Sequence, residues 1–151
     1  MLFRSIRLED LLNTRTFLDH NRIWEPPAEP FLTEKSNSTG AFAFRGKRLE
    51  NAAVEQSLTE HLQKWMPFIR KHGLLLIELH TIAPALAAAN LGRTAATAYD
   101  TTHGFSDQYI LEIEAFRAAA ERAGLRSNER FFSRFPNSDL ATVSIHLFET
   151  S

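Results

Sequence analysis

Apolar side chains recur along the chain at helical spacing in one long segment. One stripe, with successive spacings of four, four, three and four, consists of Val54, Leu58, Leu62, Trp65 and Ile69. This pattern predicts an amphipathic helix, whose start the sequence places near Arg48, Leu49 or Glu50. Pro67 lies inside the stripe and is expected to kink or break the helix near Lys64. Gly73 then ends the segment.

Short runs without helical spacing predict strands. The run "LLLIELH", residues 74–80, is continuous and apolar, which is typical of a parallel strand buried on both faces. Residues 11–17 predict a shorter strand, although Leu8, Leu11 and Leu12 also fit one face of a helix. "WEPPAEP" is predicted to be a loop, because each Pro removes a backbone donor. "STGAFAFRG" is either a short extended piece or an ordered loop.

A second helix is predicted to begin in the stretch "YDTTHGFSDQY", residues 99–109. Ser106 or Asp107 has the chemistry of an N-cap, and Gly124 is the stop signal. The apolar face of this helix consists of Ile110, Ile113, Phe116 and Ala120. Before it, "TIAPALAAANLG" predicts a short helical turn that starts at its Pro, followed by a loop to Tyr99.

The C-terminal segment predicts an antiparallel hairpin. "RSNERFFSRF" is the first strand, "PNSD" the turn, and "LATVSIHLF" the second strand, with alternating apolar and polar positions. The order of elements is therefore strand, helix, strand, helix, strand and antiparallel strand. This order predicts one α/β domain, residues 1–151, with parallel strands, helices on both faces and a C-terminal antiparallel hairpin.

Composition narrows the classes of function. With 17 basic and 18 acidic residues the net charge is −1, so no strong field attracts nucleic acid or an anionic membrane. No apolar run approaches the ~20 residues of a membrane span, and no signal-like segment is visible, so we expect a cytoplasmic protein. There is no Cys, and a metal would therefore need His, carboxylate or amide ligands.

Three polar clusters are expected at the same edge of the predicted sheet. They are "LDHNR" after the first strand, "ELH" at the end of the second, and "THGFSDQ" at the predicted helix start. Ligands of open parallel sheets bind beyond the carboxyl ends of the strands, so the clusters predict a site. In the first cluster, Asp19, His20 and Asn21 are candidates for orienting a substrate or binding a cofactor. The alternative is a polar turn capped by Asp19.

The other two clusters offer catalytic and metal-binding candidates. His103 and Gln108 could bind a divalent metal such as Mn or Fe, with Asp107, His80 or water completing the shell. The alternative is that Ser106 and Asp107 cap the helix and His103 is polar surface. His80 is a candidate base or ligand, or else a hydrogen-bonded histidine at a strand end. Glu78, on the same strand face, is costly there unless a cation, His or metal pairs with it.

The remaining histidines and the tryptophans are interpreted as structural. His61 and His72 lie on helix faces, and His146 alternates with the apolar positions of the last strand. Trp24 and Trp65 are expected to pack against apolar neighbours rather than stack on a cofactor.

Four motifs carry a family resemblance over roughly residues 8–149: "TRTFLDHNR", "TGAFAFRG", "GLLLIELHT" and "YDTTHGFSDQY". With them the chain resembles the second half of a class I S-adenosylmethionine-dependent methyltransferase, and more specifically polyketide-synthase-associated domains, including a metal-dependent branch that methylates carbon. The resemblance implies a metal on His103 and Gln108 and a small-molecule or carrier-protein-bound acyl substrate, and His80 and His103 are our catalytic candidates. The metal would polarise a 1,3-dicarbonyl unit and stabilise its enolate.

One departure from that family concerns its cofactor. The family binds S-adenosylmethionine at a Gly-rich turn, whereas the six glycines here are isolated. The resemblance places residues 11–17 at the fourth strand of the family's sheet, so the cofactor-binding half is expected elsewhere. The first strand would then be an unpaired edge, and edges tend to pair with another chain. We therefore expect a homo-oligomer or a missing N-terminal half.

Three functions remain open from the sequence. The first is a methyltransferase that is complemented by a cofactor-binding half. The second is a non-catalytic interaction module that dimerises through its first strand. The third is a small metal-dependent hydrolase or isomerase built on His20, His80 and His103.

Overall fold

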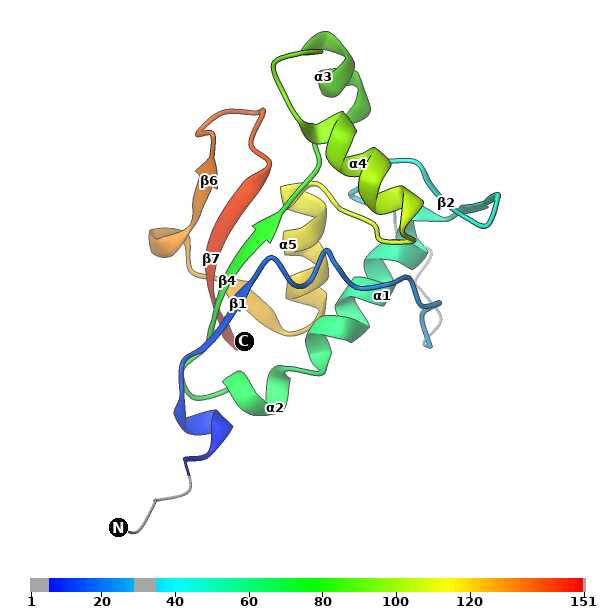
Figure 1. Ribbon diagram of the computed structural model, residues 1–151. Helices are drawn as coiled ribbons and strands as arrows, with labels where there is room; N and C mark the ends of the chain where they lie inside the picture. The colour runs from blue at the N-terminus through cyan, green and yellow to red at the C-terminus, as the bar shows by residue number, and fades with distance from the viewer. Residues whose placement is uncertain (1–5, 29–34, 151) are drawn as a thin grey trace.

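The sheet of this protein has a pair of parallel strands at one edge. Next to its other edge lies a strand that runs antiparallel to all of its neighbours. The computed structural model describes residues 6–28 and 35–150. Strands β1 (Asn13–Thr16), β4 (Leu74–Leu79), β7 (Val143–Thr150) and β5 (Leu125–Ser127) follow in this order, and β6 (Ser133–Phe135) also pairs with β7 (Figure 1). β1 is parallel to β4, and β7 is antiparallel to β4, β5 and β6. Only β7 therefore opposes the common direction, which confirms a partial Rossmann-like α/β sheet with a C-terminal antiparallel hairpin.

The first long helix is divided as its proline predicts. α1 (Asn51–Gln63) ends before Lys64, and α2 (Met66–Ile69) has Pro67 in its first turn. Pro lacks a backbone N–H, so it is tolerated only where a new helix begins. The predicted start near Arg48 or Leu49 is wrong, because β3 (Lys47–Leu49) pairs antiparallel with β2 (Phe42–Phe44). The "STGAFAFRG" motif is thus partly extended.

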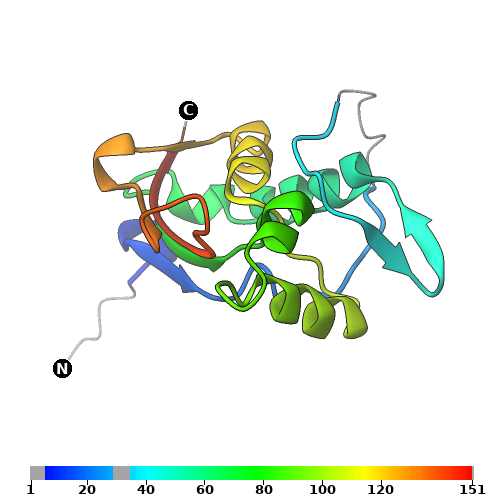
Figure 2. The ribbon, with the colours of Figure 1, turned by 90° about the horizontal axis from the view of Figure 1, so that it is seen from above.

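Helices α1 and α5 (Ile113–Arg122) pack against each other and against the same face of the sheet (Figure 2). On that face Leu74, Leu76 and Phe148 are almost completely buried. Burying an apolar side chain of this size contributes roughly 1.5–3 kcal/mol relative to exposure. This interface is the main hydrophobic core.

The opposite face of the sheet is only half buried. Its side chains alternate with the buried ones along β4 and β7, and they are Leu75, Ile77, Leu79, Val143, Ile145 and Leu147. We predict helices on both faces from the sequence, whereas α1 and α5 both cover one. The apolar pattern of "LLLIEL" therefore indicates a strand with apolar side chains on both faces. Helices α1 and α5 cover one of these faces.

The last strand differs from its apolar pattern in which face is buried. Ser144 and His146 lie on the buried face with Phe148, whereas Val143, Ile145 and Leu147 are on the half-buried one. The predicted first strand of the hairpin is interrupted: a 3₁₀ turn, Glu129–Phe131, separates β5 from β6. The prediction of one continuous strand over "RSNERFFSRF" is therefore wrong.

The stretch "YDTTHGFSDQY" ends a helix instead of starting one. After the short α3 (Pro84–Ala89), which begins at its proline as predicted, α4 spans Ala96–Phe105 where the sequence predicts a loop up to Tyr99. The Thr94 hydroxyl accepts a hydrogen bond from the Ala96 backbone N–H at this helix start. A Thr followed by an Ala-rich run is the signal that the periodicity argument misses.

Residues 107–112 form an extended connection between α4 and α5. Its backbone is tied to Trp24 and Thr81: Trp24 N–H donates to the Asp107 carbonyl at 2.8 Å, and Thr81 N–H to the Leu111 carbonyl at 3.3 Å. Asp107 has a φ of 57°, outside the right-handed helical region. Ser106 and Asp107 are therefore not N-caps, and the N-cap of α5 is Glu112, five or six residues later than predicted. Ile110 is buried, but it belongs to this extended segment and not to a helix.

Gly73 is required between α2 and β4 for two physical reasons. Its φ is +78°, and a Cβ there would lie 2.4 Å from the Phe148 carbonyl oxygen. A side chain would meet both the strain of a left-handed backbone and a steric clash.

None of the helices in the described ranges has the length and apolar character to cross a bilayer.

Candidate active site

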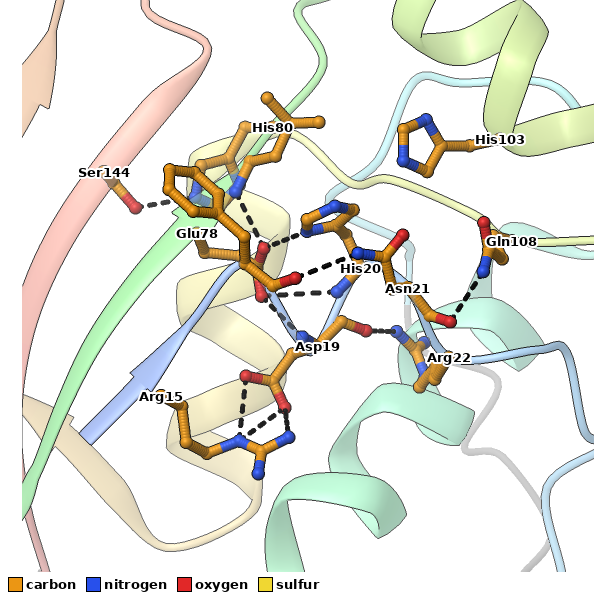
Figure 3. A network of polar contacts seen from close by, with 12 residues as sticks. Arg15, Asp19, His20, Asn21, Arg22, Glu78, His80, His103, Gln108 and Ser144 are labelled. Atoms are coloured by element: carbon orange, nitrogen blue, oxygen red, sulfur yellow. Dashed lines mark hydrogen bonds and ion pairs between the residues drawn. The ribbon is translucent and has the colours of Figure 1, made fainter. Parts of the chain in front are cut away.

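A buried histidine–carboxylate pair lies where β1 and β4 end (Figure 3). The His20 Nδ1 atom contacts the Glu78 Oε1 atom, and both side chains are nearly inaccessible to solvent. His20 follows β1 in the turn 17–21, whereas Glu78 is near the carboxyl end of β4. The parallel pairing of these strands brings the two residues together. The partner that Glu78 needs is thus a histidine.

The Glu78 carboxylate is held in place by three backbone N–H groups as well. Asp19 N–H and His20 N–H donate to Oε2 at 2.9 and 3.2 Å, and Leu79 N–H donates to Oε1 at 2.8 Å. Donors of this kind stabilise the ionised carboxylate. An ionised Glu78 accepts only, so His20 Nδ1 must carry the proton that joins them. In neutral His20 the lone pair is therefore on Nε2, at the opposite edge of the ring.

Asp19 anchors the turn that presents His20. Its fully buried carboxylate receives Arg15 at 2.9–3.1 Å and His61 at 2.8 Å. Burial by itself raises the pKa of Asp19, but the hydrogen bonds from His61 and Arg15 outweigh it and lower that pKa below its usual range. The carboxylate is therefore committed to the protein interior, which supports the turn interpretation over a cofactor-binding role.

Neighbouring residues of the turn are also engaged within it. The Asn21 side-chain amide donates to the Phe17 carbonyl at 2.9 Å. Arg22 donates to the Asp19 carbonyl at 2.9 Å, and burial lowers the pKa of Arg22 to about 10 against the attraction of Asp19 and Glu78. Arg22 therefore stays protonated at neutral pH and adds positive charge beside two carboxylates.

His103 lies against His20, although it comes from α4. The two rings meet edge to face with 5.0 Å between their centroids. The His103 Nδ1–H donates to the Tyr99 carbonyl at 2.7 Å, which leaves Nε2 of neutral His103 as an acceptor or ligand atom. The Gln108 amide donates to the Asn21 carbonyl at 2.7 Å. The first and third polar clusters thus converge as the sequence predicts.

His80 belongs to a separate buried chain of hydrogen bonds. Its Nδ1–H donates to the Leu111 carbonyl at 3.2 Å, and its Nε2 contacts the Ser144 hydroxyl at 2.6 Å. Ser144 continues to His146 at 2.8 Å. Burial lowers the pKa of His80 to about 3, so the side chain is neutral. This geometry supports the strand-end interpretation, and it does not bring His80 together with His20 and His103 as one trio.

A pocket of about 420 Å³ is lined by residues 40–43, by Thr81 and Ile82 and by residues of the segment 100–110, and His20 and Glu78 do not line it. Its wall is mostly apolar, with Thr81, Asp100 and Gln108 as polar exceptions. A much smaller cavity of about 10 Å³ is lined by His20 and Glu78. Tyr109 and Ile110 line both cavities, so the two cavities adjoin each other at these residues.

Comparison with known proteins identifies the family. A family model described as the AprA MT2-like domain, a methyltransferase family, matches residues 2–146. The chain belongs to this methyltransferase family. It is a methyltransferase domain related to those associated with polyketide synthases. None of the curated proteins matches the chain.

The described residues of this methyltransferase domain include a histidine with a carboxylate partner, His20, and a mostly apolar pocket. The glycines of the sequence are isolated, and none of them belongs to a G-x-G-x-x-G turn.

For a metal, the donor set is sparse. Over residues 6–28 and 35–150, no group of three or more His, Asp or Glu side chains is arranged to hold an ion. Three atoms in the same region could act as metal ligands: Nε2 of His103, Nε2 of His20 and the amide oxygen of Gln108. The Gln108 oxygen also accepts a hydrogen bond from the Ser106 hydroxyl at 3.3 Å. Metal binding by His103 and Gln108 stays a prediction.

Two functional features were not apparent in the sequence. Arg15, which fixes the Asp19 turn, carries an i, i+4 charge pattern that sequence reasoning passed over. Asp100 lines the pocket, yet it lies in a segment interpreted as a loop. Recognising α4 would have placed Asp100 and His103 on neighbouring positions of one helix.

Proposed function

We propose that this domain methylates an acidic carbon of a small acyl substrate, using S-adenosylmethionine bound largely by a cofactor-binding half outside the described residues. The observation that carries the proposal is the His20–Glu78 pair. A carbon next to a carbonyl must lose a proton before it attacks a methyl group. A neutral imidazole with a free Nε2 is suited to that task.

Glu78 has a positioning role in this reaction. It holds His20 in the tautomer whose Nε2 can accept a proton, and its negative charge stabilises the imidazolium that results. The three backbone donors keep the carboxylate from rotating away. S-adenosylmethionine would supply the electrophilic methyl group. The substrate carbanion would form the new C–C bond as the bond between that methyl group and the sulfonium sulfur breaks, S-adenosylhomocysteine would leave, and His20 would hold the abstracted proton until it passes to water.

The acyl group of the substrate is proposed to occupy the pocket of about 420 Å³, which shares Tyr109 and Ile110 with the small cavity that His20 and Glu78 line. Phe42, Ile82 and Ile110 provide apolar surface for it. A short or branched acyl chain that is carried as a thioester suits such a wall, because apolar burial provides affinity without a charge requirement.

The proton-abstraction step can be measured without the cofactor. In deuterated water the wild-type domain should speed exchange of the α-proton of an acetoacetyl thioester, followed by NMR. His20→Ala should lower this rate by about 10²–10⁴-fold, the usual contribution of a general base. Glu78→Gln should also lower it, since the histidine tautomer is then no longer specified.

His72→Ala is the matched control, because His72 lies exposed in the turn before β4. Its exchange rate should equal that of the wild type. Equal rates for His20→Ala and wild type, with both folded by circular dichroism, would remove His20 from the reaction.

A second function, a dimerising module, is favoured by one observation. The half-buried face of the sheet and the outer edge of β1 present apolar and hydrogen-bonding surface, and Leu11, Leu12 and Phe17 beside that edge are exposed. Either a second copy or the cofactor-binding half could cover it. The exchange experiment separates this module from an enzyme.

A further inference from the structure

The polar end of the pocket offers hydrogen-bond acceptors and few free donors. The Thr81 hydroxyl donates to the Asp100 Oδ2 atom at 2.8 Å, so its single proton is already used. Asp100, when ionised, can only accept. A ligand that brings its own donor can therefore add a hydrogen bond to the Asp100 carboxylate at this end of the pocket.

Other donors around the pocket are committed elsewhere. The Gln108 amide donates to the Asn21 carbonyl at 2.7 Å, and the Tyr109 hydroxyl donates to the Ala43 carbonyl at 2.6 Å. Both interactions fix wall segments in place. Among the described residues, the side-chain hydrogen bond that Asp100 accepts in the pocket comes from Thr81.

The surroundings of Asp100 make an added donor favourable. Burial raises the pKa of Asp100, and the nearby Glu112 carboxylate raises it further, while Thr81 and His103 act in the opposite direction. A carboxylate that is partly shielded from water gains from an additional N–H or O–H group. The same negative charges disfavour a ligand that carries a free carboxylate there.

The position of Asp100 indicates which part of a ligand it meets. The residue is exposed, at the rim of the pocket, whereas Ile82 and Ile110 are buried in its wall. The apolar end of an acyl substrate would lie against the wall. The segment that leaves the pocket, which carries the thioester sulfur and the arm beyond it, would pass Asp100.

We propose that Asp100 is a specificity-determining residue that accepts a hydrogen bond from an amide N–H on the thioester arm of the substrate. This inference rests on the proposed function for the identity of the substrate. Thr81 orients the carboxylate, and the apolar wall binds the acyl end. The domain would then select neutral acyl groups that are presented on an amide-bearing arm.

The test compares two probes by NMR chemical-shift titration of the backbone amides of Gly104 and Ile110. The first is the propionyl thioester of N-acetylcysteamine, and the second is the same thioester with its amide N-methylated. Wild type should bind the first probe about tenfold or more tightly than the second, as expected for a hydrogen bond to a charged group. Asp100→Ala should reduce this ratio to near one, and Asp100→Asn should keep part of it.

Asp139→Ala is the control, because Asp139 is strongly exposed and lies in the loop before β7. Its ratio should match that of wild type. Equal binding of both probes to wild type, an unchanged ratio in Asp100→Ala, or no binding of either probe would overturn the proposal. His20→Ala should retain the ratio while it loses α-proton exchange. A wild type with the ratio but without exchange would refute the proposed reaction and leave the role of Asp100 standing.

Discussion

Glu78 shows how a single buried charge shapes the site. A carboxylate at the end of a buried strand must find donors nearby, because an isolated charge there is very costly. The sequence indicates that cost, and it suggests Arg, His or a metal as the partner. The structure decides for His20 and for the backbone of the turn. The turn that provides the counter-groups is itself fixed by Asp19 and Arg15.

At the same scale, His103 and Gln108 remain the predicted metal ligands. After incubation with Mn or Fe and mild dialysis, His103→Ala and Gln108→Ala should each lose bound metal, because each removes one donor from a sparse set. Inductively coupled plasma mass spectrometry measures the content. His72→Ala serves as the control and should retain the wild-type content. Unchanged metal in both site variants would return these residues to a structural role.

Among the elements, the connection from α4 to α5 was hardest to predict. Ile110, Ile113, Phe116 and Ala120 have helical spacing, so the sequence favours one helix from residue 106. Backbone hydrogen bonds from Trp24 and Thr81 hold residues 107–112 extended instead. Those partners are far away in the sequence. Local periodicity cannot include them, whereas α5 itself and Gly124 as its stop are confirmed.

The buried histidines at the end of β4 and within β7 predict how stability depends on pH. His80 and His146 face the core, and burial lowers the pKa of each to about 3, against 6.5 for an exposed histidine. Between these pH values the unfolded chain binds protons that the folded chain excludes. The free energy of unfolding should therefore fall as pH decreases below 6.5, by up to about 1.4 kcal/mol per pH unit for each histidine.

This slope is measured by urea unfolding of wild type and His146→Gln between about pH 7.5 and about pH 4.5. These limits lie on either side of the usual pKa of histidine. The slope of the variant should lack roughly half of the contribution that His80 and His146 together make to the wild-type slope. His72→Gln, in an exposed turn, should keep the wild-type slope. Parallel slopes for wild type and His146→Gln would show that His146 has the same pKa in the folded and unfolded states, which would contradict the prediction.

For the whole molecule, the outer edge of β1 is the feature with the largest consequence. Phe17 N–H donates to the Ile77 carbonyl at 2.8 Å, so alternate residues of β1 face β4 and Thr14 faces the outer edge. This edge continues the half-buried apolar face. An unpaired edge of this kind recruits another strand.

We therefore expect the isolated domain to self-associate through β1. Thr14→Pro removes an outward N–H without removing a β1–β4 hydrogen bond, and it should weaken association measured by sedimentation velocity. Thr14→Ala retains the N–H and is the control. A monomeric wild type would exclude association through this edge, and equal association of both variants would place the interface elsewhere.

The sequence by itself determined the α/β class, the break of α1 at Pro67, the buried run of β4 and the convergence of three polar clusters at one sheet edge. These features depend on local periodicity, backbone chemistry and the direction of parallel strands. Only the tertiary structure decided that His20 pairs with Glu78, that His80 is withdrawn into the core with Ser144, and that Asp100 borders a pocket. Such pairings depend on contacts between residues that are distant in the chain, and the sequence pattern around each residue does not encode which partner it will meet.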